Sequence, residues 1–306
     1  MKLVVADDFH QGVDDAFAMR DPDLASEGSV GPYDSQRLGG TAIAKNIILD
    51  RQAARVRIVV NGALLAAGPD ASVSPWAVFL IAHELAHPIL ERRRRTSGAL
   101  EREPEYPRTA TEAARAFVRS ALDELHADLM ADIVLGHLWS VEIEGQDARP
   151  VRATDLEVVL GQHLQVADVL DSHVHPGWPD LVDAHRNWRL SVNDLYVRLF
   201  RETDQMLTLL GHAQAEATWL EQLGPLEAEC SDHPGAQLYL ADVWRRIMKI
   251  RDESEFSTDP DVICEQDLAI VAEGEAAVLQ MWQRLGLTFD IYEDRGMYIH
   301  VDEPLR

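Results

Sequence analysis

The sequence predicts an α+β protein that is mainly helical, with a small sheet near its start. Two short β-branched runs, residues 47–49 and 56–60, are separated by a polar break, which is typical of neighbouring strands. From about residue 155 onward, apolar side chains such as Leu195 and Leu199 recur at three- and four-residue steps, which favours helices. The chain closes with two strand-like runs on either side of a Glu-Asp-Arg-Gly break, which indicates a hairpin.

The chain divides into three parts by composition. Residues 1–40 are acidic and rich in turn formers, so we expect a loosely held lead-in. Residues 41–150 contain the predicted sheet and the motifs described below, and residues 151–306 form a mainly helical body that ends in the hairpin. No long Pro/Gly/Ser-rich linker separates the second part from the third, so we expect the helical body to pack against the part before it.

Charge and cysteine content exclude several classes of function. The 52 acidic residues outnumber the 28 basic ones and give a formal charge of −24, which repels phosphate backbones and anionic membrane surfaces. We therefore expect neither direct nucleic-acid binding nor membrane binding. The two cysteines, Cys230 and Cys264, are far apart and predict no disulfide framework or zinc knuckle. Without a long apolar signal core or membrane span, the sequence favours a cytoplasmic location.

A His-Glu-x-x-His motif lies in an apolar, helix-favouring run, residues 79–87. Residues four apart lie on the same face of a helix, so His83 and His87 can bind one metal ion together. Glu84 lies about 100° further round the helix, where it can act on a water at the metal without being a ligand. The motif therefore predicts a zinc site with Glu84 as the general base.

A third ligand is expected from a second helix, residues 122–131, where Glu124 and Asp128 are four apart and share a face. Ala127 and Ala131 lie beside them and allow the two helices to approach closely. Glu124 is the predicted zinc ligand, and Asp128 is free to accept the outer ring N–H of a ligating histidine. Helical geometry turns three other potential ligands away from the Glu124 face: Asp123, His126 and Asp132. The alternative is a chance motif followed by a solvated acidic helix.

These motifs, in this order after the run at residues 58–61, resemble the ImmA/IrrE family of soluble zinc metallo-endopeptidases, which are gluzincins. The resemblance covers roughly residues 40–140. It implies a zincin-like core with a small sheet beside the active-site helix, Zn²⁺ bound by His83, His87 and Glu124, and Glu84 as the catalytic residue. It also implies cleavage of one or a few intracellular proteins, such as a transcriptional regulator.

The chain departs from the family pattern at three places. Pro88 follows the second histidine and is expected to kink or stop the helix there. The gap before Glu124 is long, and residues 91–108 are expected to form an exposed, inserted loop that contains four adjacent arginines, residues 92–95. Those arginines are either simply solvated or part of a mobile rim that recognises an acidic substrate. Met130 stands where the family prefers Phe.

A second histidine cluster follows at residues 171–180. Zinc peptidases often have a further donor that stabilises the oxyanion, and His175, or else His173, is the candidate here. Two alternatives are a surface loop with accidental histidines and a second metal site at His173, His175 and His185.

Two classes of function fit these patterns. The first is a zinc-dependent endopeptidase that acts on a protein or peptide substrate. The alternative is a non-catalytic regulatory or binding protein with a structural or vestigial metal site. An intact Glu84 favours the peptidase, because only a catalytic site needs a general base.

Overall fold

The structure is a computed structural model that describes residues 1–22, 36–37, 40–41, 44–50, 52–62, 74–97, 109–141, 148–156, 161–227, 230–252, 259–292 and 296–304. The protein is α+β and mainly helical, which confirms the predicted class. The chain folds into two compact units. The first contains Met1–Glu105 and Asp123–Leu160, and the second contains Tyr106–Leu122 and Gly161–Arg306.

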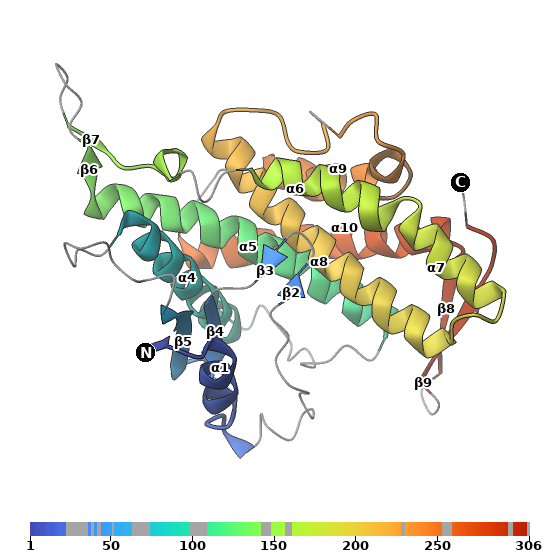
Figure 1. Ribbon diagram of the computed structural model, residues 1–306, viewed down its shortest axis with the longest axis horizontal. Helices are drawn as coiled ribbons and strands as arrows, with labels where there is room; N and C mark the ends of the chain where they lie inside the picture. The colour runs from blue at the N-terminus through green and yellow to red at the C-terminus, as the bar shows by residue number, and fades with distance from the viewer. Residues whose placement is uncertain are drawn as a thin grey trace. The chain divides into compact units, whose positions relative to one another are not determined.

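A three-stranded sheet forms the centre of the first unit, with the strand order β1-β5-β4 (Figure 1). Strand β5 (Val56–Asn61) pairs in parallel with β1 (Lys2–Ala6) and antiparallel with β4 (Ala44–Ile48). Because side chains alternate between the faces of a strand, β5 contributes to two separate clusters. Val59 packs in one of them with helix α1 (Phe9–Phe17), on one face of the sheet.

The other face of the sheet packs against helix α4 (Pro75–Ser97). Ile58 and Val60 are fully buried there, in contact with Leu80 and Leu85 of α4. The helix that carries the His-Glu-x-x-His motif is therefore fixed directly on the sheet. The sequence predicted a small sheet beside this helix from the runs at residues 47–49 and 56–60, but not the contribution of β1.

Residues 1–22 are not the loosely held lead-in that their acidic, turn-rich composition suggests. β1 forms a five-residue ladder with β5, from Lys2 opposite Arg57 to Ala6 opposite Asn61. α1 is capped by Asp8, which accepts from the N–H of Gln11, and buries Val13 and Ala16 completely. The prediction of a loosely held segment is therefore wrong for residues 1–22. Residues 23–35, 38 and 39 lie outside the described residues.

Helix α4 does not stop at Pro88. It continues to Ser97, and the residues after the proline are held by tertiary contacts, since Leu90 and Arg94 are buried. The prediction of an exposed loop is therefore wrong for residues 91–97, and residues 98–108 lie outside the described residues. Arg94 donates to both carboxylate oxygens of Asp123, including 2.8 Å from Nη1 to Oδ2. Packing and this ion pair outweigh the one backbone hydrogen bond that proline removes.

Replacing Arg94 with Met should lower the free energy of unfolding by about 3 kcal/mol, because it leaves the Asp123 carboxylate without its main cation. Chemical denaturation of the full chain measures this change. Arg92 is the matched control, since it lies on the same helix and is exposed, and Arg92→Ala should change the same quantity by less than about 0.5 kcal/mol. If Arg94→Met changes the free energy of unfolding as little as Arg92→Ala does, Arg94 contributes no more than a solvated arginine.

Helix α5 (Ala110–Leu138) carries the second predicted motif. Its residues from Asp123 onward belong to the first unit, and its earlier residues belong to the second. In the first unit, Asp132 accepts hydrogen bonds from Arg152 and from the backbone N–H of Ala153, at the 3-10 helix η1 (Ala153–Asp155). The unit also contains two short antiparallel pairs: β2 (Gln36–Arg37) with β3 (Gly40–Thr41), and β6 (Ser140–Val141) with β7 (Arg149–Pro150).

The second unit consists mainly of helices, which Figure 1 shows in green to red. They are α6 (Gln162–Val169), π-helical η3 (Leu170–Val174), α7 (Gly177–Arg186), α8 (Val192–Trp219), π-helical η4 (Ala236–Leu240), α9 (Ala241–Asp252) and α10 (Pro260–Arg284). The hairpin at the end is confirmed, because β8 (Leu287–Tyr292) pairs antiparallel with β9 (Gly296–Val301).

The core of the second unit follows the apolar stripes that the sequence shows. Leu195 and Leu199 of α8 are almost completely buried, as predicted. Phe200 of the same helix stacks on Trp282 of α10 with their ring centroids 4.2 Å apart, and Phe117 of α5 meets both rings edge to face. No helix in the described part of the chain is long and apolar enough to cross a membrane.

Candidate metal centre

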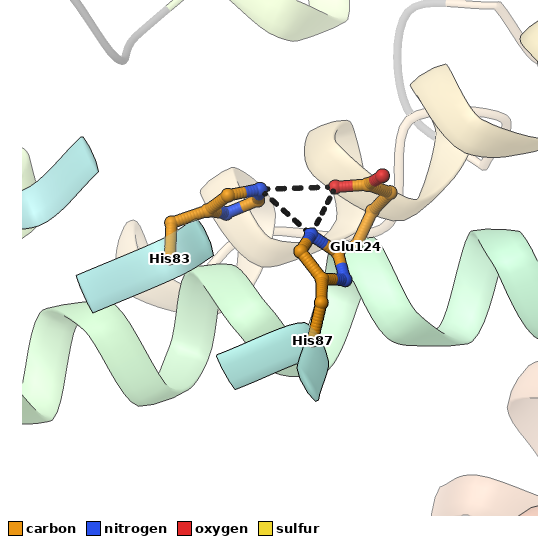
Figure 2. A group of neighbouring side chains, drawn as sticks. All are labelled: His83, His87 and Glu124. Carbon is orange, nitrogen blue, oxygen red and sulfur yellow. Dashed lines mark hydrogen bonds and ion pairs between the residues drawn. The ribbon is translucent and has the colours of Figure 1, made fainter. Parts of the chain in front are cut away.

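The three predicted ligands lie together in the first unit, two on α4 and one on α5. Nε2 of His83 lies 3.2 Å from Nε2 of His87. Oε2 of Glu124 lies 3.1 Å from the first nitrogen and 3.4 Å from the second. Figure 2 shows the two rings and the carboxylate pointing toward one another. Within the described ranges, this is the only group of three or more potential ligands close enough to hold one ion.

The spacing of these atoms matches a tetrahedral zinc site. Zinc bonds to nitrogen and oxygen are about 2.0–2.2 Å long, so tetrahedral ligand atoms lie about 3.3 Å from each other. The observed separations of 3.1 to 3.4 Å bracket that value. Two histidines and a glutamate are a set typical of catalytic zinc, with one tetrahedral position left for water. The residues present therefore fit Zn²⁺.

Asp128 fixes the orientation and the tautomer of His83. Its Oδ1 lies 2.7 Å from Nδ1 of the imidazole, and both residues are buried. An ionised carboxylate can only accept, so the proton of a neutral His83 lies on Nδ1. Nε2 then presents its lone pair to His87 and Glu124. Three electron-pair donors thus converge on one point, which is unfavourable unless a cation or a proton lies between them.

The electrostatic field at this point favours positive charge. Burial alone lowers the pKa of His83, but Asp128 and then Glu124 outweigh it and raise that pKa well above the usual value. The same two carboxylates favour a divalent cation at the centre. Both come from one face of α5, four residues apart, as the sequence predicted.

Glu84 lies beside the three potential ligands without joining them. It is only 8% exposed, and its Oε2 accepts a hydrogen bond of 3.0 Å from Nδ2 of Asn46. Asn46 is in the middle of β4, which lies at the edge of the three-stranded sheet. The amide therefore holds one of the two carboxylate oxygens of Glu84.

Asn46 is a residue that sequence reasoning missed. The available signal was alternation, because Ala44 and Ile48 share its parity and belong to the cluster that packs on α4. A polar side chain at that parity is directed at the motif helix and needs a partner there. Only the folded structure shows that the partner is Glu84.

The competing carboxylates on α5 are engaged elsewhere. Asp123 binds Arg94, and Asp132 binds Arg152 and the N–H of Ala153. His126 is buried on the same helix but is not a member of the group of potential ligands. The ranking of Glu124 above these three residues therefore agrees with the geometry.

The second histidine cluster belongs to the other unit. His173 lies in η3, and the backbone N–H of His175 donates to the carbonyl of Leu170 where that helix ends. His185 lies on α7 and contacts the carbonyl of Leu190 through Nδ1, at 2.9 Å. These three histidines do not form a potential ion site within the described part of the chain, so a second metal site there finds no support. The oxyanion role of His175 stays a prediction.

No protein-family model, curated protein or solved structure matches this chain. The likeness to the ImmA/IrrE family therefore depends on the motifs and on their order along the chain.

Proposed function

We propose that this protein is a zinc-dependent endopeptidase of the gluzincin type, with a zincin-like core like that of the ImmA/IrrE family. The observation that carries the proposal is the triangle of His83, His87 and Glu124 donor atoms, with the buried carboxylate of Glu84 beside it. A structural metal site has four protein ligands and needs no extra carboxylate, whereas a catalytic site needs both a free position and a base.

Glu84, Asn46 and Asp128 have separate roles in the proposed reaction. When bound, zinc supplies a Lewis acid for the scissile carbonyl and makes the attacking water more acidic. Glu84 takes the proton of that water on the carboxylate oxygen that Asn46 does not hold, and passes it to the leaving nitrogen. Asp128 keeps the Nδ1 proton on His83, so that Nε2 remains a ligand.

The sheet suggests how a substrate binds. β4 lies at the edge of the strands described in this unit and carries Asn46 next to Glu84. An extended peptide that adds to an edge strand is held by main-chain hydrogen bonds, whatever its side chains. Such a peptide would place a backbone carbonyl near the metal centre. The proposed substrate is thus a protein segment in extended conformation.

The proposed substrates are one or a few intracellular proteins, such as a transcriptional regulator, in line with the family resemblance and a cytoplasmic location. A comparison of new protein termini in cells with the wild-type chain and with Glu84→Gln tests the proposal. A small set of termini that appears only with the wild type supports it. Zinc-loaded protein that generates no new termini would instead favour a non-catalytic role.

Replacing Asn46 with Ala should lower kcat about tenfold, because Glu84 loses the amide that fixes its orientation. KM and zinc content should stay near the wild-type values. Lys45→Ala on the same strand, with its side chain on the opposite face, is the matched control and should leave all three unchanged. If Asn46→Ala lowers zinc content as well, the amide supports the metal site and not the base alone.

A further inference from the structure

Trp188 occupies a backbone position that normally requires glycine. Helix α7 ends in a Schellman motif, in which the N–H of Trp188 donates to the carbonyl of His185 and the N–H of Arg189 donates to that of Ala184. Trp188 is the left-handed residue of this motif, with a φ of 60°. A bulky residue in this conformation is less stable than glycine, because its Cβ lies too close to the backbone.

The side chain of Trp188 does not recover that cost through contacts with the described residues. It is 95% exposed, the highest value among the large apolar side chains in the described part of the protein. A single exposed apolar residue is ordinary, but an exposed tryptophan in a strained glycine position carries the backbone strain and gains nothing from burial. Contact with something outside the chain accounts for both.

Two exposed arginines flank Trp188, although the chain as a whole is strongly acidic. Residues 184–193 contain two arginines and no acidic residue, whereas the whole chain has a formal charge of −24. Both arginines, Arg186 and Arg189, are exposed. Arg186 has only a loose contact of 3.5 Å with Asp183, and Arg189 has no ion-pair partner among the described residues. Figure 1 shows the turn between α7 and α8 at an end of the helices that it joins.

We propose that the Trp188 surface, defined as Arg186, Trp188 and Arg189, docks a short acidic segment of a partner protein. The indole packs on aliphatic side chains of that segment, and the two guanidinium groups bind its carboxylates. Tryptophan and arginine are the residues most enriched among those that dominate protein interfaces. This surface lies in the second unit, and the proposal does not depend on the metal centre.

Charge decides among the possible occupants. A nucleic acid or an anionic membrane extends beyond the basic surface and meets the field of a chain that carries −24. A second copy, docked symmetrically, would place arginines opposite arginines. A short acidic segment docked at Trp188 interacts most strongly with Arg186 and Arg189, because charges beyond about 8–10 Å are screened at physiological salt.

The test uses the full chain and a labelled 12-residue peptide of alternating Glu and Leu, with fluorescence anisotropy as the measurement. We expect saturable binding that weakens at least tenfold in Trp188→Gly and in Arg189→Glu. Trp188→Gly should leave the melting temperature unchanged or higher, because glycine suits the left-handed position. Loss of binding in that variant then cannot be ascribed to unfolding. Leu164→Ala, an exposed apolar site on α6, is the control and should bind like the wild type.

Three further measurements separate the other occupants: titration with a ten-residue oligothymidylate, sedimentation with phosphatidylserine vesicles, and light scattering for self-association. Preferred binding to the oligonucleotide or to the vesicles would overturn the proposal. Self-association that depends on Trp188, without peptide binding, would overturn it as well. So would peptide binding that Trp188→Gly leaves unchanged, or the absence of any peptide binding.

Discussion

Glutamine in place of Glu84 should lower turnover by about 10²–10⁴-fold while the protein stays folded and keeps its zinc. The amide has the shape of the carboxylate and still offers an oxygen to Nδ2 of Asn46, so the hydrogen bond of 3.0 Å can persist. It cannot take a proton from water at neutral pH. Steady-state kinetics on an identified substrate measure the loss, and metal analysis of the same sample measures the zinc.

The control for this substitution lies on the same helix. Glu91 is seven residues further along α4 and pairs with Arg95 instead of facing the centre. Glu91→Gln removes the same charge from the same helix and should leave kcat within about twofold of the wild type. Unchanged turnover in Glu84→Gln would remove Glu84 from the mechanism. An equal loss in both variants would point to a general effect of charge on the helix.

Purified protein should contain about one zinc per chain, and His83→Ala or Glu124→Ala should lose most of it. Each substitution leaves two protein ligands, which is fewer than the three that catalytic zinc sites retain. Emission spectrometry of protein dialysed against a weak chelator gives the stoichiometry. His137→Ala is the control, because this histidine is exposed on the ligand-bearing helix α5 and lies outside the group of potential ligands.

Asp128→Asn should have an intermediate effect on zinc binding. The amide can still contact Nδ1 of His83 but no longer brings a negative charge, so zinc affinity should fall by about 10–100-fold without being abolished. A competition titration with a fluorescent chelator resolves such intermediate affinities. Full zinc content in both His83→Ala and Glu124→Ala would show that the metal site has been assigned to the wrong residues.

The candidate site was predictable because its residues form two pairs, and the members of each pair are close together in the sequence. His83 and His87, and likewise Glu124 and Asp128, are four residues apart on helices, and helical geometry alone brings each pair onto one face. The sequence cannot give the approach of the two helices, but the small residues beside Glu124 allow it. The core stripes of α8 and the hairpin at the end of the chain are local patterns in the same sense.

The features that the sequence missed depend on partners far along the chain. β1 is read as a loose segment because its partner strand, β5, begins more than fifty residues later, and parallel pairing leaves no turn signal between them. Arg94 is one of four adjacent arginines, and only Asp123, 29 residues away, distinguishes it from its neighbours. The role of Asn46 likewise depends on its hydrogen bond to Glu84, 38 residues later.

The division of α5 between the two units affects how the chain can be cut. A fragment that ends at residue 160 contains all of the first unit, but it also carries residues 110–122 without the α8 and α10 side chains on which Phe117 packs. A fragment that begins at residue 161 lacks Phe117 altogether. Neither unit is therefore a contiguous stretch of sequence, and the ribosome must synthesise the second unit before the first part of α5, residues 110–122, has all of its neighbours. Truncation is thus a poor way to isolate the metal centre, and point substitutions in the full chain are the suitable tool.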